Sequence, residues 1–437
     1  MAPPKDGYQI GGCEDLQLPH LCRAMSWLGE ELSAREQAGK TPFAPRCPKD
    51  LIEAARFARR RDRFTPLQVV FFDTTSISVA GQGGETIGPR GSSKDHRPDL
   101  KPMIVGAVLD GQGRPIGCAL WPGNTADVTT LIPVVDRLPV RLGVTTVCLV
   151  ADRGMISEET IQALEQHGRA WPYILGARMR SQNELKDEVL ARAGRYRVVH
   201  SQRQPSADPA PLKVQEVRVE GRRYVIGRND DAARKDAADR EAIVASLREK
   251  LRTGEKSLVG NKGYRRYLNS TGVDHFQVDE AKIEEEARYD GKWVLRTNTD
   301  LDTAEVALQF KRLWMVEAWF LSTKSLLQTR PIDHKCDETL RGHVFCSFLA
   351  LVLRQELEVR LAKDGHDFEW ADVIQDLDRL QMVEVEQDGK RFLLRSGVQG
   401  TCGTVFRAAG VAVPPTVQQA PKDPADPDRN PSATPRM

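Results

Sequence analysis

The chain has 437 residues, of which 40% are hydrophobic and 28% are charged, an ordinary composition for a globular protein of roughly two or three domains. No stretch approaches the run of about 20 apolar residues that spans a bilayer, and the first residues lack the charged-then-apolar plan of a secretory signal. The eight cysteines contain no C-x-x-C pair, which argues against a zinc site and a disulfide framework. We therefore expect a protein of the reducing cytoplasm and no contact with a membrane.

The net charge is only +2, but its distribution along the chain is uneven. Residues 169–270 hold 23 Lys and Arg against 13 Asp and Glu, a balance of +10, so the remainder carries −8. The run RFARRRDRF at 56–64 is a second, smaller basic patch. A basic segment suits a polyanion such as nucleic acid, and a solvated charged face is the alternative on charge alone.

Residues 1–66 are predicted to be helical and loop-rich, with an amphipathic piece at 26–37 and a break at 42–48. From residue 67 apolar strands and helices alternate. The predicted elements are a strand at 67–80, two strands within 102–123 joined by a hairpin near Asp110-Gly111, a helix at 125–138, a buried strand at 145–152, a helix at 157–168 capped by Ser157, and a short strand at 171–177. Their order is βββαβαβ.

A basic, strand-rich insertion interrupts this order over residues 178–300. It contains a probable hairpin at 213–228, a charged helix at 239–254 and a tight turn at Asp290-Gly291. The elements predicted after it are a long helix at 303–328 with Asp302 and Glu305 in capping-box relation, an apolar core helix at 337–361, and from 412 a Pro-rich tail expected to be disordered.

Two acids lie on or directly after apolar strands. Asp73 lies on the first strand, where an apolar run meets the acid and continues with hydroxyl residues in FFDTTSIS, and Asp152 directly follows the fourth strand in LVADRGM. Either acid alone is a solvated terminus or a cap as readily as a functional group. If the first and fourth strands are neighbours, however, the two carboxylates meet, and a divalent cation such as Mg²⁺ is their natural occupant.

A third acid, Glu317, lies in the apolar surroundings LWMVEAWFL of the long helix, where a carboxylate is costly unless it is paired or bound to metal. Trp314, Leu321 and Lys324 fall on the same helical face, and Lys324 is about 10 Å along the axis, suited to a phosphate of a bound strand. Two metals about 4 Å apart activate a water or a 3′ hydroxyl in phosphodiester displacement.

The order of elements and acids resembles the RNase H-like core of DDE transposases. The motifs FFDTTS, SKDHRPDLKPMIVGAVLD, PGNTAD, VADRGMIS, LVGNKGYRRYL, YDGKWVLRTNT, LWMVEAWFLSTKSLLQTRPIDH and GHVFCSFLALVL resemble the insertion-sequence 4 superfamily, 1634 group, over roughly 67–360. The resemblance implies an α/β, RNase H-like fold with the first part of the core at 67–177, the insertion at 178–300 and the second part of the core with the catalytic helix at 301–411. Outside the resemblance lie an N-terminal helical segment at 1–66, a candidate for DNA-end contact, and the Pro-rich tail at 412–437.

The resemblance also implies that Asp73, Asp152 and Glu317 are the catalytic triad and bind two Mg²⁺ ions, with Mn²⁺ as a substitute. The signature of the superfamily on the catalytic helix has Tyr, Arg, Glu and Lys at positions that read Phe310, Leu313, Glu317 and Lys324 here. The role of Lys324 carries over, whereas the Tyr and Arg phosphate contacts are missing. Leu321 stands where the 1634 group commonly has Arg.

Several further residues are candidates for DNA contact. Trp314 and Trp293 resemble tryptophans that stack near a flipped base in related transposases, and core packing is the alternative for each. Lys94 and Arg97 lie in the loop after the first strand and are candidates for phosphate contact, with a solvated loop as the alternative. The best candidates in the insertion are Arg265 and Arg266. No metal-binding spacing links His334 and His343, so structural roles are expected for them.

The function implied is that of an insertion-sequence transposase, which cleaves DNA at the ends of its own element and transfers the strand into target DNA. Its partners are then the terminal inverted repeats and target DNA, with a dimer in the synaptic complex, at the bacterial nucleoid. Two alternatives remain: a catalytically decayed transposase acting only as a DNA-binding protein, and an RNase H-like metal-dependent nuclease that ignores element ends.

Overall fold

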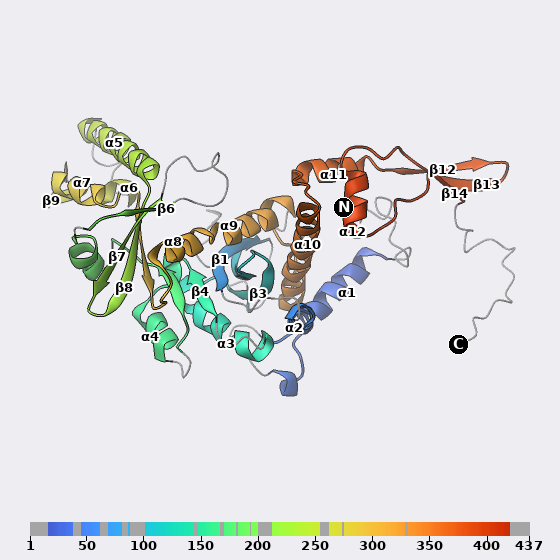
Figure 1. Cartoon of the computed structure of the whole chain (residues 1–437), viewed down its shortest axis with the longest axis horizontal. Helices are drawn as coiled ribbons and strands as arrows, with labels where there is room; N and C mark the ends of the chain where they lie inside the picture. Colours follow the sequence, from blue (N-terminus) through green and yellow to red (C-terminus); the bar gives the residue numbers. More distant parts are fainter. Residues whose placement is uncertain are drawn as a thin grey trace. The chain divides into compact units, whose positions relative to one another are not determined.

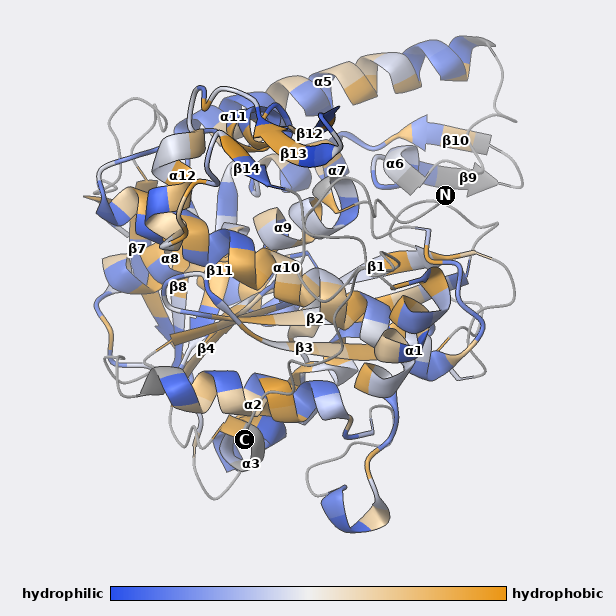
Figure 2. Ribbon diagram, turned by 90° about the vertical axis from the view of Figure 1, so that its right-hand side faces the viewer, coloured by the Kyte–Doolittle hydropathy of each residue, from blue (hydrophilic) through white to orange (hydrophobic). Residues whose placement is uncertain are grey.

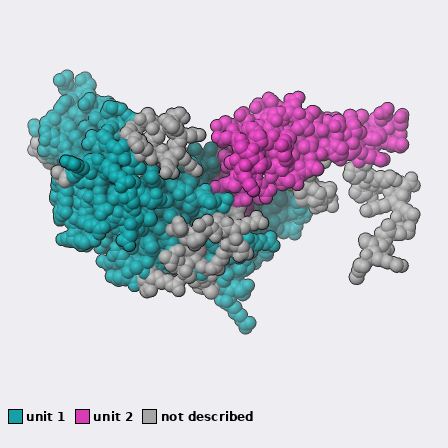
Figure 3. Space-filling model, in the orientation of Figure 1, with its two compact units in different colours: residues 1–348 teal, residues 349–437 magenta. Residues whose placement is uncertain are grey.

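The computed structural model describes residues 16–37, 45–61, 69–80, 86–87, 101–142, 147–166, 170–180, 182–192, 194–199, 212–253, 262–272, 275–327 and 331–419. Two compact units divide the chain, residues 1–348 and 349–437 (Figure 3). No helix among the described residues is both long enough and apolar enough to cross a membrane.

A nine-stranded mixed sheet is the centre of the 1–348 unit, in the order β3-β2-β1-β4-β5-β11-β8-β7-β6 (Figure 1). Strands β1, β4 and β5 are parallel, and the other neighbouring pairs are antiparallel. The predicted order βββαβαβ is confirmed, including the pairing of the first strand with the fourth. The strands are β1 Val69–Val79, β2 Lys101–Asp110, β3 Pro115–Pro122, β4 Cys148–Ala151, β5 Tyr173–Gly176, β6 Arg197–Val199, β7 Leu212–Val219, β8 Arg222–Arg228 and β11 Lys292–Thr297.

The central strands are buried on both faces, as expected for parallel strands covered by helices. Figure 2 shows the resulting hydrophobic centre of the sheet. One face packs against α2 (Pro48–Arg61), α3 (Leu131–Leu142) and α4 (Glu158–Gln166). The alternate side chains Phe72, Leu149 and Ala151 point to this face. Helices α8 (Thr303–Lys311) and α9 (Trp314–Leu321) lie against the opposite face (Figure 1).

The N-terminal helices are attached to this core. On α2, the Glu53 carboxylate accepts the Cys118 amide at 3.0 Å and the Lys49 ammonium donates to the Cys118 carbonyl at 3.2 Å, so side chains occupy part of the free edge of β3. Helix α1 (Leu18–Gly29) ends at Gly29, and only the short 3₁₀ turn Ala34–Glu36 follows, so the amphipathic helix predicted across 26–37 is wrong.

Most strands of the insertion extend the central sheet. Strands β6, β7, β8 and β11 continue it beyond β5. The predicted hairpin at 213–228 is confirmed as β7–β8, with positive φ at Glu220 and Gly221 in its turn. The remaining elements are the π-helical turn Leu185–Val189, α5 Asp230–Thr253, α6 Lys262–Arg265, β9 Leu268–Gly272, β10 His275–Val278 and α7 Glu280–Ala287, with β9 and β10 forming a separate pair.

The helix predicted at 303–328 is broken. It consists of α8 (Thr303–Lys311), α9 (Trp314–Leu321) and the π-helical turn η6 (Ser322–Leu326). At the break, the amides of Leu313, Met315 and Val316 donate to carbonyls three residues back, which tightens the helix locally. The Arg312 guanidinium donates to the Gly111 carbonyl on the β2–β3 turn, which fixes the break against the sheet. The next predicted helix is confirmed as α10 (Asp337–Lys363).

The 349–437 unit contains the C-terminal part of α10 and elements that the sequence did not predict. Its small core includes Leu361, Val373 and Val405. The elements are α11 Trp370–Asp378, β12 Met382–Gln387, β13 Lys390–Arg395, α12 Cys402–Ala409 and β14 Val417–Gln419. The three strands form a separate sheet in the order β12-β13-β14.

Candidate active site

Asp73 and Asp152 occupy matching positions on neighbouring strands. In the parallel pair of β1 and β4, Phe72 lies opposite Ala151. Asp73 directly follows Phe72, and Asp152 directly follows Ala151, so the two acids are also opposite each other. Neighbouring strands are about 4.8 Å apart, and successive side chains point to opposite faces. Because Phe72 and Ala151 face the α3 side, both carboxylates point to the face that carries α8 and α9. The sheet therefore brings the two acids together at the carboxyl end of β4.

Asp73 is half-buried, and its Oδ1 accepts the Thr74 amide at 2.7 Å. Asp152 is also half-buried and stands at the N-terminus of the short turn Arg153–Met155 in an extended conformation, and its side chain does not cap that turn. Its direction is therefore determined by the backbone. Asp73 lies inside β1, and Asp152 directly follows the end of β4.

The end of β5 holds the turn that follows Asp152. Arg178 donates from Nε to the Arg153 carbonyl at 3.0 Å and from Nη2 to the Gly154 carbonyl at 3.1 Å. A Cβ at Gly176 would lie 2.7 Å from the Arg153 nitrogen, so glycine is required for this close approach. The backbone after Asp152 is thus fixed from the β5 side.

Glu317 is level with Asp73 along the sheet. The Arg312 guanidinium lies over the Phe71 ring, 5.7 Å from its centroid, at the start of α9. Glu317 is five residues further on, about 7.5 Å along a helix axis, and Asp73 is two residues beyond Phe71, about 6.6 Å along a strand. Helix and strand run the same way, because Ile332, beyond the helix, lies beside Val79 in a parallel bridge.

The rotation of α9 turns Glu317 toward β4. Met315 contacts the β2–β3 turn, where a Cβ at Gly113 would lie 2.8 Å from its Sδ. Glu317 is two residues later, about 200° around the helix, and therefore faces the opposite flank, on the side of β4. The Glu317 side chain is exposed and lies next to the buried side of α9, which contains Val316 and Phe320.

The carboxylates of Asp73 and Asp152 thus lie on one face of the sheet, and α9, which bears the Glu317 carboxylate, packs on the same face. Oxygen donors of this kind suit a hard divalent cation, so the donor set of Asp73, Asp152 and Glu317 fits Mg²⁺ or Mn²⁺. Within the described ranges, no three Asp, Glu, His or Cys side chains are gathered closely enough to hold an ion as a group. The pairing of β1 and β4 places Asp73 beside Asp152, whereas Glu317 is on α9.

The other residues predicted on the α9 face lie in different environments. Trp314 is the first residue of α9 and is 54% exposed, so the core-packing alternative is wrong for it. Lys324 lies in η6 and is half-buried. Leu321 is 66% exposed, whereas Leu313 is buried in the core. Arg312, next to Leu313, does not replace the missing Arg, because its guanidinium is committed to Gly111 and Phe71.

Trp293 packs within the protein. Its ring lies over Gly227 on the neighbouring strand β8, where any Cβ would overlap it, and 5.8 Å from the Phe310 ring on α8. Phe310 stands at the Tyr position of the helix signature, so this position contributes to packing between sheet and helix. Lys94 and Arg97 lie outside the described residues.

Arg265 and Arg266 are both exposed, but their surroundings differ. Arg266 lies 3.6 Å from the Glu286 carboxylate and over the Tyr267 ring at 5.6 Å. Tyr267 itself is buried in the small core between α5 and the β9–β10 pair. Because Arg266 already has an acidic neighbour, we expect Arg265 to be the more available charge for an external phosphate.

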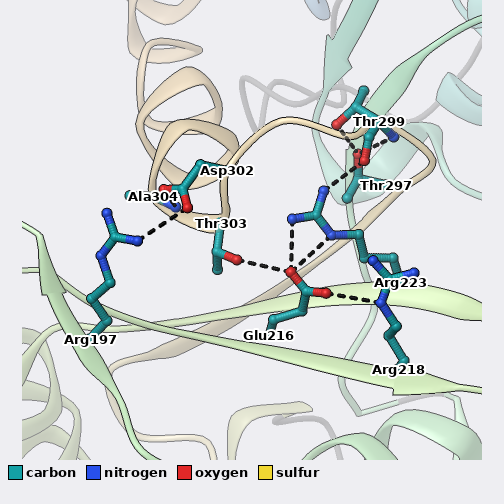
Figure 4. Close-up of polar contacts among 9 residues, drawn as sticks. All are labelled: Arg197, Glu216, Arg218, Arg223, Thr297, Thr299, Asp302, Thr303 and Ala304. Carbon is teal, nitrogen blue, oxygen red and sulfur yellow. Dashed lines mark hydrogen bonds and ion pairs between the residues drawn. The ribbon is translucent and has the colours of Figure 1, made fainter.

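Figure 4 shows how the insertion holds the start of α8. The Glu216 carboxylate on β7 accepts Arg223 Nη2 at 2.8 Å and the Thr303 hydroxyl, at the first position of α8, at 2.9 Å. Arg223 Nη1 donates to the Thr299 carbonyl at 2.6 Å. Burial alone would raise the pKa of Glu216, but its hydrogen bonds from Arg223, Thr303 and Arg218 outweigh burial and lower that pKa.

The family Transposase DDE domain matches residues 65–353 of the chain. The chain belongs to this family. The match begins just before β1 and ends in α10, so it includes Asp73, Asp152 and Glu317 together with the whole insertion. Membership in the DDE transposase family implies DNA transposition as the activity of this domain.

Among solved structures, the chain is similar to a piggyBac transposase in a synaptic complex with hairpin DNA, with a TM-score of 0.35 and 10% sequence identity. The similarity covers 72% of this chain and 52% of that chain, so this protein spans about half the length of that transposase. The search of curated proteins found no match.

The sequence analysis did not identify three residues that hold this site. Arg178 and Arg312 donate to backbone carbonyls, and no spacing pattern marks such contacts. Asp127, in the motif PGNTAD, accepts the Thr74 hydroxyl at 2.7 Å. The sequence does mark Asp127, because an acid directly follows the turn after the third strand. The motif PGNTAD, however, supports only the family resemblance and assigns this acid no contact.

Proposed function

We propose that this DDE transposase domain mobilises an insertion sequence of the insertion-sequence 4 superfamily, 1634 group. It cleaves DNA at the ends of its own element and joins the freed 3′ hydroxyl to target DNA, in the cytoplasm at the bacterial nucleoid. The observation that carries the proposal is the register of β1 and β4, which sets Asp73 beside Asp152 under the helix that bears Glu317.

In this proposal Asp73, Asp152 and Glu317 hold two Mg²⁺ ions, with Mn²⁺ as a substitute. When bound, such ions activate the attacking water or hydroxyl and stabilise the leaving oxygen. The protein contributes position: β1 and β4 hold two carboxylates in register, and the Arg312 contact to Gly111 holds the helix of the third. An arrangement prepared in this way needs little reorganisation at the reacting phosphate.

The proposed DNA contacts surround the acids. Lys324 would contact a phosphate of the cut strand, and the exposed ring of Trp314 would stack on an unpaired base. Arg265, Arg266, Lys94 and Arg97 would contact the backbone of the element ends, while Trp293 supports the site by packing against Phe310. Two ends must be held at once, so a dimer on the terminal inverted repeats is proposed.

The decayed-transposase alternative rests on the helix signature. Leu313 is buried and Leu321 is exposed at positions where the superfamily has phosphate-binding residues. If these losses abolish chemistry, the protein would bind the ends without cutting them. The nuclease alternative instead predicts cutting that does not depend on the ends.

The test is metal-dependent cleavage and joining of a plasmid that carries the ends flanking the gene. With Mg²⁺ or Mn²⁺ we expect end-specific cuts and joined products. The variants Asp73→Asn, Asp152→Asn and Glu317→Gln should lower both by about 100-fold or more, because each removes a metal-binding carboxylate. The matched control is Glu188→Gln, which neutralises an exposed carboxylate on the π-helical turn of the insertion and should leave activity unchanged.

Binding of the ends by the unmodified chain with no cleavage would support the decayed copy. Cutting of plasmids without the ends would support the nuclease. Full activity in Asp152→Asn would exclude the proposed triad.

A further inference from the structure

One side chain outside the triad contacts the chain beside both strand acids. Asp127 lies in the 3₁₀ turn Asp127–Thr129 that precedes α3, on the face of the sheet opposite Glu317. Its neighbours are Thr74, directly after Asp73, and Gly154, two residues after Asp152.

The contact to β1 is a hydrogen bond. The Thr74 hydroxyl, on a side chain only 4% exposed, donates to Asp127 Oδ1 at 2.7 Å. The amide of the same Thr74 donates to Asp73 Oδ1 at 2.7 Å. Thr74 therefore lies between Asp127 and Asp73: its hydroxyl donates to Asp127, and its amide donates to Asp73.

The Asp127 carboxylate also lies beside the turn after β4. A Cβ added at Gly154 would make an ordinary van der Waals contact with Asp127 Oδ2 at 3.6 Å, so the carboxylate is a neighbour of Gly154 with room for a methyl group between them. The same two turns meet again where the Thr130 hydroxyl contacts Met155 Sδ at 3.5 Å, and Thr130 also donates to the Asp127 carbonyl at 2.6 Å. The turn that carries Asp127 is thus fixed against the turn that follows Asp152.

We propose that Asp127 is a positioning residue that sets the separation of Asp73 and Asp152 through its hydrogen bond from Thr74 and the packing of its turn, through Thr130 and Met155, against the turn after β4. This inference rests on the proposed function of the two strand acids. It assigns Asp127 no contact with metal or DNA, since Asp127 lies on the other face of the sheet.

Substitutions at positions 127 and 74 distinguish the effect of the hydrogen bond from the effect of the Asp127 charge. Asn at position 127 keeps an oxygen that accepts the Thr74 hydroxyl but removes the charge, whereas Ala removes both. Thr74→Ser keeps the hydroxyl, and Thr74→Val replaces it by a methyl group of similar shape. A positioning role through the hydrogen bond predicts that Asn and Ser preserve function and that Ala and Val impair it.

The experiment uses the full chain and two readouts: Mn²⁺ affinity of the protein alone, by electron paramagnetic resonance of free Mn²⁺, and end cleavage at saturating Mn²⁺. We expect Asp127→Ala and Thr74→Val to raise the Mn²⁺ Kd by about 10-fold to 100-fold, as outer-shell replacements do, and Asp127→Asn and Thr74→Ser to stay within about threefold. Thr129→Val, on the same turn, is the matched control because the hydroxyl of Thr129 bonds only within that turn to Ala126 in the described contacts. Thermal unfolding of each variant reports on folding, and Thr74→Val carries the test if Asp127→Ala unfolds.

The outcomes distinguish this proposal from the proposed function. Asp73→Asn and Asp152→Asn test the function itself: if neither weakens Mn²⁺ binding, both proposals fail. If they abolish binding while Asp127→Ala and Thr74→Val match the unmodified chain, positioning by Asp127 is overturned and the triad stands. An Asp127→Asn variant as impaired as Asp127→Ala would overturn the hydrogen-bond role in favour of the charge.

Discussion

The pair His334 and His343 shows how single residues join the segment after η6 to α10. His334 Nε2 and His343 Nδ1 are 3.0 Å apart, and the rings meet edge to face. His334 lies two residues after Ile332, whose amide donates to the Ser78 carbonyl of β1 at 3.1 Å. The pair thus joins α10 to the segment beside β1, which confirms the structural role expected for these residues.

Burial, and then the neighbouring His334, lowers the pKa of His343 from 6.5 to about 4. Burial also lowers the pKa of His334, against the opposing effect of Asp333. Between pH 6.5 and about 4 the histidine is protonated in the unfolded chain but neutral in the folded chain. The free energy of unfolding is therefore highest above pH 6.5 and decreases as the pH falls toward 4. For His343 alone we expect a slope of up to about 1.4 kcal/mol per pH unit in urea unfolding over that range.

His343→Asn should remove most of this slope and lower the stability at pH 7. The control, His366→Asn in the 349–437 unit, should keep the slope of the unmodified chain. An equal slope in all three proteins would place the pH dependence in other groups.

How far single residues could be predicted depends on the signal that each carries. Asp73, Asp152 and Glu317 are visible because a carboxylate in apolar surroundings is anomalous in any window. Asp127 and Arg178 are ordinary polar residues in turns, and only the pairing of distant strands gives them partners. Trp314 was ambiguous, because the sequence does not say which side of a nearly all-apolar helix faces water.

At the scale of elements, the crossing of α1 and α10 depends on two glycines. A Cβ at Gly342 would overlap the carbonyl oxygen of Met25, and one at Gly29 would overlap that of Glu338. Arg341 Nε donates to the Gly29 carbonyl at 2.8 Å at the same crossing. The helices are therefore close enough that backbone contacts backbone, which leaves no flexible side chain to move aside.

Gly342→Ala should destabilise the chain by about 1–3 kcal/mol, because the added methyl group can be accommodated only by separating the helices. The measurement is urea unfolding followed by circular dichroism. Gly403→Ala on α12 is the matched control: its Cβ would make an ordinary 3.7 Å contact with Val398, and replacing glycine within a helix should stabilise by up to about 1 kcal/mol. Equal effects of the two substitutions would contradict the close crossing.

The elements that the sequence predicted are those with strong local patterns. Strands β2 to β5 are nearly continuous apolar runs, β1 begins with one, and α10 has a long apolar face, so their existence and order followed from periodicity. The break at Arg312 was not predictable, because it depends on a contact with Gly111 on a distant turn. Strands β12 and β13 were missed because their side chains are mostly polar or exposed.

At the scale of the molecule, the positive charge is concentrated in residues 169–270, which carry +10 against −8 elsewhere and lie mostly within the insertion. The strands β6 to β8 continue the sheet of the acids, so this basic segment is joined to the same sheet. It contacts the first turn of α8 through Glu216 on β7 (Figure 4). The sequence located the charge but not the continuous sheet, because pairing of β11 between β5 and β8 joins segments far apart in the chain.

This distribution predicts a specific salt dependence of DNA binding. Each phosphate contact contributes about 0.9 to the slope of log Kobs against log salt concentration. Arg265→Ala should lower the slope by about that amount and weaken binding for all sequences alike. Arg266→Ala should change the slope less, because Glu286 at 3.6 Å already offsets the charge of Arg266.

The matched control is Arg407→Ala, which removes an exposed arginine of the 349–437 unit and should leave the slope unchanged. Fluorescence anisotropy of a labelled duplex at several salt concentrations measures all three. Equal losses for the three variants would mean that binding follows total charge and that the insertion has no special part in it.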